Sequence, residues 1–326
     1  MHIDRRHFGA LTAGALAALS IKQTAWAQEN YPGKPVKLVV PFSPGGGTDT
    51  VARTLCQLMS KNLGQPIIID NRPGASTILG SEVVAKSPPD GYTLLVATLA
   101  HAVNLSMQPK MPYNTEKDFA AVTLIGSSHN VLVVRPDSPF KTVKDVLDAA
   151  KAEPGKLYYA SQGGGTSAHL AGEMFRNLTG ANITHVPYKG AGPALTDVLG
   201  GQVTMMFATH AAVAGFLASN RLRAIGVTAP KGQSKLPGVP SIEETVPGYV
   251  VDSWYALYAA AGTPTPVIQK IITSVKTACE NPEFIKRAAD EGITLRPGAP
   301  ADLDAFVKAD IERWRKIIRE NQITPD

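Results

Sequence analysis

Residues 38–53, LVVPFSPGGGTDTVAR, join an apolar strand-like run to a helical pattern through a loop with three consecutive glycines. Glycine lets the backbone turn and approach a ligand closely, because it has no Cβ. The first N–H groups of a helix lack intrahelical partners and lie at the positive end of its dipole, so they attract anions. This stretch therefore predicts an anion site, lined by Ser43, Gly45, Gly46, Gly47 and Thr48.

The same pattern recurs downstream, where a strand-like run over residues 157–160 meets SQGGGTSAH, residues 161–169, and a second helix. Short glycine runs can repeat by chance in a chain with 29 glycines. Both copies, however, follow a strand and open a helix, which is the context that gives such a loop a binding role. The second copy predicts a matching site, lined by Ser161, Gly163, Gly165, Thr166 and Ser167.

Short apolar runs alternate with helical patterns around both loops, which predicts an α/β fold built from βαβ units. Residues 67–69 and 93–97 are typical of buried parallel strands, and residues 76–85 predict a helix between them. Ligands of such sheets gather at the carboxyl ends of strands. Three polar residues follow such an end and either reach the pocket or lie in a solvated loop: Thr98, His101 and Asn104.

Two longer extended runs occupy residues 122–134 and 248–261. After them the sequence is helical over residues 267–280, 283–291 and 300–321. The last helix carries apolar residues at helical spacing, which is typical of a packing face rather than of a membrane or partner site.

The N-terminus predicts a signal peptide over residues 1–27. Arg5 and Arg6 precede an apolar stretch, and residues 25–27, Ala-Trp-Ala, give a cleavage pattern that either the twin-arginine or the ordinary secretory route would use. We therefore expect a mature protein in the periplasm. Removing these residues lowers the formal net charge from +5 to +3. That balance suits a small anionic ligand and is too weak for nucleic acid.

Cysteine is scarce, with Cys56 and Cys279 only. An exported protein permits a disulfide, although one bridge would not make a disulfide scaffold. Cys56 lies among apolar residues on a helix face, so a buried free thiol is the alternative.

Eight segments, taken in order, resemble the tripartite tricarboxylate transporter receptors, also called the Bug or TctC family of extracytoplasmic solute-binding proteins. They are residues 38–53, 71–75 (NRPGA), 89–94 (PDGYTL), 159–163 (YASQG), 186–190 (VPYKG), 199–203 (LGGQV), 236–241 (LPGVPS) and 261–264 (AGTP). The resemblance extends over residues 31–326.

The resemblance implies a two-lobed, type II-like periplasmic binding protein of the Venus-flytrap kind. The runs over residues 122–134 and 248–261 would cross between the lobes as a hinge. Lobe 1 would then combine residues 28–126 with 254–326, and lobe 2 would comprise residues 127–253. A small carboxylate ligand, the membrane subunits of a tripartite tricarboxylate transporter as partner, and a monomeric receptor are the further expectations.

The chain departs from the family pattern at three places. Family members often carry a glycine pair where Ser76 and Thr77 stand, an acidic residue in place of Thr204, and Asp or Asn near Ala208 and Thr209. The first departure changes the detail of a loop, and the other two predict a less polar pocket wall beyond Phe207, so the identity of the ligand cannot be taken from relatives.

Two facing helix N-termini, one per lobe, would each offer backbone N–H groups to a carboxylate at one end of the ligand. Asp49 would cap its helix rather than contact an anion. His169 either donates to a carboxylate or is bonded to backbone, and Lys189 either adds charge or lies on the surface. The remaining candidates are Phe42 and Phe207, which either sandwich an aromatic ligand or belong to the core, and the pocket-edge residues Tyr188 and Thr209.

An enzyme, a cofactor and a metal are not expected. Neither glycine loop contains GxGxxG or a P-loop lysine, and HExxH, CxxC and GxSxG are absent. We therefore expect capture of a small dicarboxylate, with a phthalate-type aromatic diacid as a variant, and delivery to a membrane transporter. The alternatives are a ligand-sensing subunit that docks on a periplasmic sensor kinase and, more remotely, an exported enzyme acting on a carboxylate.

Overall fold

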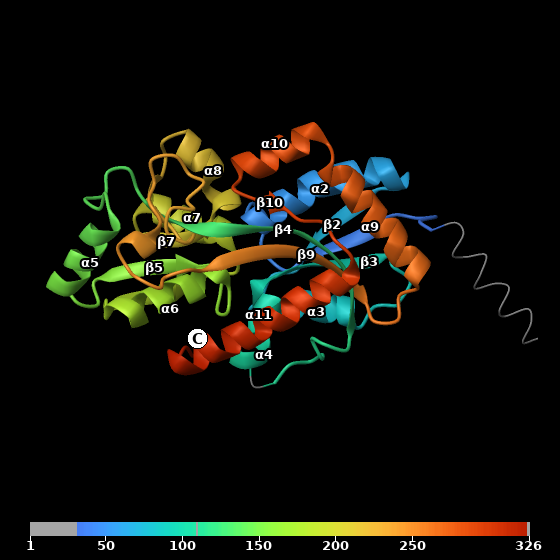
Figure 1. Cartoon of the computed structure of the whole chain (residues 1–326), viewed down its shortest axis with the longest axis horizontal. Helices are drawn as coiled ribbons and strands as arrows, with labels where there is room; N and C mark the ends of the chain where they lie inside the picture. Colours follow the sequence, from blue (N-terminus) through green and yellow to red (C-terminus); the bar gives the residue numbers. More distant parts are fainter. Residues whose placement is uncertain (1–30, 109, 325–326) are drawn as a thin grey trace, which may run out of the picture.

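A computed structural model describes residues 31–324 apart from residue 109 (Figure 1). The predicted signal peptide over residues 1–27 lies outside the described residues. Within the described part of the chain, no helix is both long enough and apolar enough to cross a bilayer.

The first lobe is a mixed sheet between two helical layers. Its strands lie in the order β2-β1-β3-β9-β4, with β1, β2 and β3 parallel and β9 antiparallel to both of its neighbours. The strands are β1 (Val36–Val40), β2 (Ile67–Asn71), β3 (Thr93–Thr98), β9 (Asp252–Ala260) and the short β10 (Thr294–Leu295), which pairs with β4 (Phe119–Val134). The helices are α2 (Gly47–Leu63), α3 (Ile78–Ala85), α4 (Leu99–Met107), α9 (Thr265–Cys279), α10 (Pro282–Asp290) and α11 (Pro300–Glu320).

Alternate residues of these strands enter two separate cores. Leu38 and Leu94 pack with α2 and α9, whereas Val39 and Leu95 pack on the opposite face with α4 and α11. Because both faces are covered, the strands are apolar along their whole length rather than alternating.

The second lobe repeats this arrangement on a smaller scale. Its strands are β5 (Leu157–Ser161), β6 (Ile183–Pro187), β7 (Met205–Thr209) and β8 (Arg223–Val227). Its helices are α5 (Val143–Ala152), α6 (Ser167–Thr179), α7 (Ala191–Gly200), α8 (His210–Ala218) and the single turn η1 (Ile242–Glu244). In both lobes a glycine loop joins a strand to a helix, β1 to α2 and β5 to α6, as the sequence predicts.

Two strands connect the lobes, as expected. β4 pairs with β9 from Phe119 to His129, and from Asn130 onward it pairs with β7 and β8. The polar residues 127–130 lie within β4 and pair across this change of partner. The Thr228 hydroxyl accepts the Asn130 N–H at 2.8 Å and donates to the Val251 carbonyl, which ties the start of β9 to the same point. This change of partner supports the division into lobes at residues 126/127 and 253/254, which stays a proposal.

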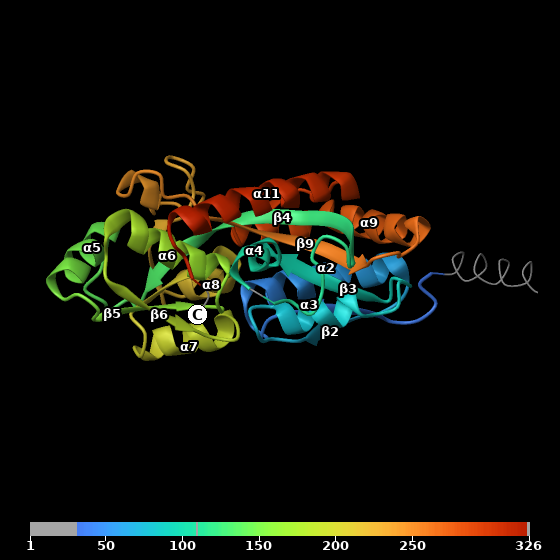
Figure 2. The same cartoon turned by 90° about the horizontal axis from the view of Figure 1, so that it is seen from below.

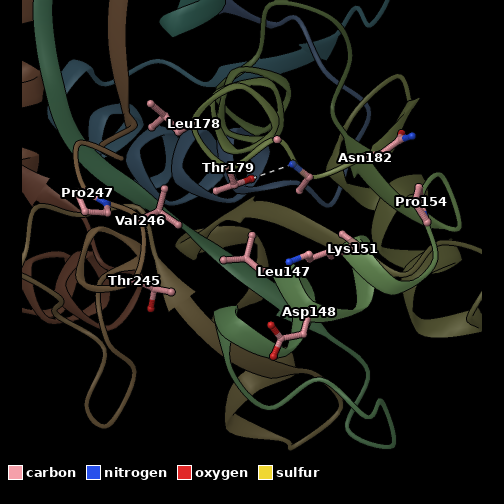
Figure 3. Close-up of a pocket in the computed structure, with 13 residues that line it drawn as sticks. Leu147, Asp148, Lys151, Pro154, Leu178, Thr179, Asn182, Thr245, Val246 and Pro247 are labelled. Carbon is pink, nitrogen blue, oxygen red and sulfur yellow. Dashed lines mark hydrogen bonds between the residues drawn. The ribbon is translucent and has the colours of Figure 1, made fainter.

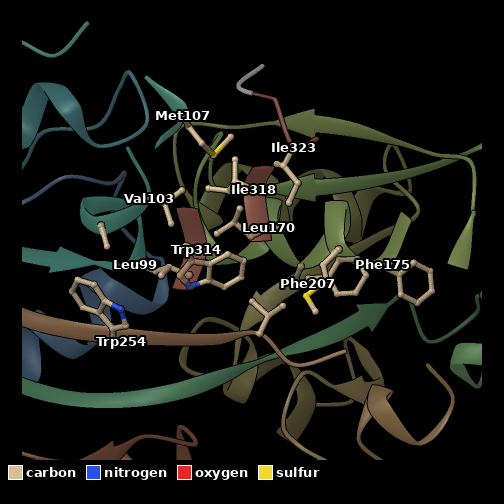
Figure 4. Packing of buried hydrophobic residues seen from close by; sticks show 14 of the residues in the cluster. Leu99, Val103, Met107, Leu170, Phe175, Phe207, Trp254, Trp314, Ile318 and Ile323 are labelled. Atoms are coloured by element: carbon tan, nitrogen blue, oxygen red, sulfur yellow. The ribbon is translucent and has the colours of Figure 1, made fainter. Parts of the chain in front are cut away.

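Helix α11 spans both lobes (Figure 2), lying along β4 from lobe 1 toward α6. Trp314 and Trp254 are fully buried, and they belong to one apolar cluster with Val103 of α4 and Leu170 of α6 (Figure 4). Just beyond α11, the Asn321 carbonyl accepts a hydrogen bond from the Asn177 side chain of lobe 2 at 2.9 Å. The C-terminal helix therefore joins the cores of the two lobes.

A buried carboxylate fastens α11 to the hinge strand β9. Asp310, whose side chain is 4% exposed, accepts the Trp254 indole N–H at 2.9 Å and pairs with Arg313, which also binds Asp252. Burial raises the pKa of Asp310, and Arg313 and Trp254 oppose that rise by stabilising its charged form.

The two cysteines are not bonded to each other. Cys56 and Cys279 are free thiols in the core between α2 and α9. Burial raises the pKa of both thiols to about 12, so they act as small apolar side chains.

We predict that Arg313→Met lowers the free energy of unfolding by about 1–3 kcal/mol, because it leaves the buried Asp310 without its cation. The measurement is urea unfolding followed by circular dichroism. Arg315→Met on the same helix is the matched control, since Arg315 pairs with Glu312 on the surface and is 52% exposed. Its effect should stay within about 0.5 kcal/mol. Equal losses in the two variants would contradict the role given to Asp310.

Candidate ligand site between the lobes

The first glycine loop is held in place by Asp49, one of the first residues of α2. Its carboxylate accepts the Gly45 N–H at 3.0 Å, the Arg53 guanidinium at 2.8 Å and the Asn71 side-chain amide at 2.9 Å. Burial alone would raise the pKa of Asp49, but these hydrogen bonds outweigh it and hold the pKa below its ordinary value. Asp49 is therefore a support for the loop, and its oxygens face protein donors rather than an anion.

The same loop packs directly against lobe 2. A Cβ added to Gly47 would lie 2.4 Å from the Thr209 hydroxyl and 3.1 Å from the Ala212 nitrogen, at the start of α8. A Cβ on Gly46 would lie 3.3 Å from the Ala191 Cβ, at the start of α7. These glycines allow the N-terminus of α2 to meet two helix N-termini of the other lobe.

Ser43 forms a direct link between the lobes. Its N–H and its hydroxyl both donate to the Lys189 carbonyl, at 3.1 and 2.9 Å. Nearby, a Cβ on Gly192 would lie 2.8 Å from the Pro44 carbonyl oxygen. The structure is thus in a closed arrangement, with the backbones of the two lobes in contact.

Buried polar side chains hold the second glycine loop. The Ser161 hydroxyl accepts the Gly163 N–H at 3.0 Å, the Thr166 hydroxyl donates to the Gly163 carbonyl at 2.7 Å, and His169 Nδ1 accepts the Gly165 N–H at 3.1 Å. Ser167 bonds to Asn130 of the hinge strand at 3.2 Å. Ser161, Thr166 and His169 thus bond to the loop backbone and Ser167 bonds to a hinge side chain, and their predicted contact with a ligand stays a prediction.

Backbone donors remain available at both loops. Among the described residues, no hydrogen-bond acceptor faces the N–H groups of Gly46, Gly47 and Thr48 in the first loop. The same holds for Gly164 and Ser167 in the second loop. Such groups require an acceptor when water is excluded, and a helix N-terminus favours an anionic one.

A cavity of about 570 Å³ opens between the lobes beside these loops. Lobe 1 contributes Ser43 and Ser76, and lobe 2 contributes Gly163, Gly164, Pro187, Tyr188, Lys189 and Pro193. The Tyr188 hydroxyl donates to Asp197, and burial together with this carboxylate raises the pKa of Tyr188 to about 12. Lys189 is exposed and carries a positive charge at the cavity. None of the described residues that line the cavity is acidic, so no negative charge offsets it there.

Four of the predicted residues therefore line one cavity: Ser43, Gly163, Tyr188 and Lys189. Sequence reasoning missed Ser76, Gly164, Pro187 and Pro193. Gly164 lies inside the predicted loop and Pro187 inside the family-like VPYKG segment, so both could have been included. Nothing in the local pattern indicated Ser76, because its placement depends on an unusual backbone turn.

Asn104 and Thr209 lie at the contact between the lobes rather than in the cavity. Asn104 is fully buried on α4, donates to the Ser76 carbonyl at 2.8 Å, and has its Oδ1 against Gly165 of lobe 2. Thr209 faces Gly47, as described above. Thr98 is buried at the end of β3, immediately before α4.

The structure does not bring His101 into this group. The segment after β3 is the buried helix α4 and not a solvated loop, and it directs the His101 ring toward Phe119 and Tyr258, with ring centroids 4.9 Å away in each case. Neither ring nitrogen has a hydrogen-bond partner among the described residues. Burial lowers the pKa of His101 to about 4, so the ring is neutral at pH 7.

The predicted aromatic sandwich of Phe42 and Phe207 is not formed either. Phe207 is fully buried and packs on Tyr159, Phe175 and Tyr249 inside lobe 2 (Figure 4). Phe42 belongs to the separate core beneath α2. Both faces of β7 are covered by helices, so an aromatic residue there enters a core.

A larger hollow of about 690 Å³ lies elsewhere, on lobe 2 between α5 and the end of α6 (Figure 3). Leu147, Lys151, Leu178 and Thr245 are among its lining residues, and none of the predicted ligand residues is. Among the residues that the structure describes, no group of His, Cys, Asp and Glu side chains could hold a metal ion. The polar groups that line the cavity between the lobes come from backbone, from Ser43, Ser76 and Tyr188, and from Lys189.

We predict that Asp49→Asn loosens the first loop and lowers the free energy of unfolding by about 2 kcal/mol at pH 7, because it removes a charged acceptor of three hydrogen bonds. The folded carboxylate has a lowered pKa, so its stabilisation is present above about pH 4 and is lost as the pH falls through the folded pKa. The difference between wild type and variant should therefore shrink in acid. The control is Asp148→Asn, a 62% exposed partner of Lys144. A difference that does not depend on pH would count against the carboxylate.

Comparison with known proteins supports a single family. A family model described as the tripartite tricarboxylate transporter family receptor matches residues 51–323. A protein from the tcbD-tcbE intergenic region of Pseudomonas sp. (strain P51) is 36% identical over 324 residues, covering 99% of this chain and 96% of its own.

The solved structure of R. palustris Rpa4515 with adipate is 35% identical, covers 91% of this chain and 100% of its own, and superposes with a TM-score of 0.87. MatC from Rhodopseudomonas palustris, with bound malate, is 33% identical, covers 88% and 100%, and gives a TM-score of 0.84. The chain belongs to the tripartite tricarboxylate transporter receptor family.

Proposed function

We propose that this receptor captures a small dicarboxylate in the periplasm by closure of its lobes and delivers it to the membrane subunits of a tripartite tricarboxylate transporter. One observation carries the proposal. The cavity between the lobes is lined by Gly164 of the second glycine loop, whose N–H is unpaired, by Ser43 just before the first loop and by Lys189, and none of the described residues that line it is acidic. The chain is a solute-binding receptor and not an enzyme, as its family shows.

The physical chemistry of the cavity favours a carboxylate. Each loop presents unpaired N–H groups at the positive end of a helix dipole. Hydrogen bonds to a charged acceptor are about twice as strong as neutral ones, and they strengthen further where the lobes exclude water. Since the donors come from both lobes, a ligand with an anionic group at each end would bind both at once.

Relatives favour an aliphatic diacid. The structures of Rpa4515 and MatC contain adipate and malate, and both ligands have two carboxylates. The phthalate-type alternative rests on Phe42, Phe207 and the apolar Ala208, and the rings of Phe42 and Phe207 lie in the cores of the two lobes. With that sandwich absent, the aromatic variant loses its main support and the linear diacid becomes the first choice.

Delivery to a transporter and export by the predicted signal peptide remain part of the proposal. A sensor-kinase partner would require the same fold and the same ligand site. A pull-down of the loaded receptor against membrane subunits and against a sensor-kinase ectodomain distinguishes the two, and failure to bind the transporter would overturn the uptake role.

We predict that adipate or malate raises the melting temperature of the receptor and that the matched monoacids, hexanoate and butyrate, do so much less. A ligand at a hundredfold excess over Kd stabilises by about 2.7 kcal/mol, which a thermal-shift assay detects as a rise of several degrees. Phthalate and benzoate form the aromatic pair of the same screen. Monoacids that stabilise as well as diacids would show that the two loops do not each bind a carboxylate.

We predict that Gly192→Ala weakens diacid binding at least tenfold without lowering the melting temperature of the unliganded protein. In a helix, alanine is favoured over glycine by about 1 kcal/mol. In the closed arrangement, however, the new Cβ would lie 2.8 Å from the Pro44 carbonyl of lobe 1. Isothermal titration with adipate and malate gives the affinity, and small-angle scattering gives the degree of closure.

The matched control is Gly200→Ala at the end of the same helix, where no atom lies within 4 Å of the added Cβ. This variant should bind like wild type. If Gly192→Ala also binds like wild type, the contact between Gly192 and Pro44 is not needed for binding.

A further inference from the structure

Three consecutive non-glycine residues just before α3 adopt left-handed backbone conformations. The φ angles of Ala75, Ser76 and Thr77 are +45°, +52° and +77°. L-amino acids avoid this region because the Cβ approaches the following carbonyl oxygen, and for a β-branched residue such as Thr77 it is a genuine outlier. A turn of this kind persists only where the surrounding structure holds it.

Asn104 of α4 provides much of that support. Its side-chain amide donates to the Ser76 carbonyl at 2.8 Å and to the Thr77 hydroxyl at 3.4 Å. Asn104 is fully buried and Thr77 is 4% exposed, so these contacts are shielded from water. The Ile78 N–H closes the turn by donating to the Ala75 carbonyl at 3.0 Å.

The strained turn places one side chain at the ligand cavity. Ser76 is half-buried and lines the cavity on the lobe 1 side, together with Gly164 and Lys189 of lobe 2. Its hydroxyl has no hydrogen-bond partner among the described residues, whereas its carbonyl is bound by Asn104. Glycine at position 76 would adopt the same conformation without strain. What serine provides and glycine would not is the hydroxyl side chain at the cavity.

We infer that Ser76 is a specificity-determining residue, whose hydroxyl donates a hydrogen bond to a carboxylate oxygen of the bound ligand beside the Gly164 N–H and Lys189. This inference rests on the proposed function and adds a side-chain donor to a site otherwise described by backbone N–H groups. A hydroxyl paired with a charged acceptor is among the stronger hydrogen bonds, and it selects for an anionic group at this end of the ligand.

The test uses three variants of the full mature chain, with Kd measured by isothermal titration against adipate and malate. Ser76→Ala keeps the strained backbone and removes only the hydroxyl, so it should weaken binding about tenfold with little change in melting temperature. Ser76→Gly should raise the melting temperature, because it relieves the strain, and should weaken binding at least as much.

Ala75→Gly is the matched control. Ala75 has the same left-handed conformation, is exposed and does not line the cavity. This variant should also raise the melting temperature and should leave Kd unchanged. Weakened binding in Ala75→Gly would show that the turn conformation matters rather than the hydroxyl, and would overturn the inference.

The outcomes separate the inference from the proposed function. If wild type binds neither diacid nor any acid of the screen, the proposed function fails. If wild type binds a diacid and Ser76→Ala binds it equally well, the function stands and the role of Ser76 is overturned.

Discussion

The close approach of two backbones at the lobe interface is the constraint on which the site depends. Gly46 and Gly47 let the start of α2 touch the starts of α7 and α8, and Gly192 meets the Pro44 carbonyl from the other side. Side chains at these positions would hold the lobes apart. Once the lobes meet, water is excluded from the unpaired N–H groups of both loops, and each such group then needs an acceptor. Under the proposed function, closure and anion binding would therefore be coupled, because the ligand would supply the acceptors that water provides in the open state.

Polar side chains around the loops bind the loop backbone and do not line the cavity. Asp49 and His169 accept N–H groups of their own loops, and Asn104 braces the turn that contains Ser76. Each bond uses one donor or acceptor of the loop and fixes where the remaining donors point. Such prearranged donors need little reorganisation when an anion arrives, which favours tight binding. Many polar residues near the site do not face the cavity, because they are buried and hydrogen-bonded to the loops.

The sequence predicted the parts of this fold that depend on local pattern. The apolar strands, the two glycine loops and the C-terminal helices follow from periodicity and turn chemistry, and β4 and β9 occur where two crossing strands were expected. Other features depend on tertiary contacts. Residues 99–107 are apolar on nearly all sides, so their pattern does not distinguish a helix from a loop, and only packing directs His101 toward Tyr258. Phe207 lies in a strand buried on both faces, where alternation carries no information about which face meets the ligand. The left-handed conformation of residues 75–77 could not be predicted locally, because none of these three residues is glycine.

The hinge sets a limit on how this receptor opens. Thr228 joins β4 and the residue before β9 through hydrogen bonds to Asn130 and Val251, so we expect rotation between the lobes to take place at this short segment. Trp314 and Ile318 of α11 belong to one apolar cluster with Leu170 of lobe 2, so α11 packs against both lobes. Wide opening would expose this apolar surface to water at about 25 cal/mol per Å². The lobes should therefore open by a small angle at the cavity, while the α11 side stays packed.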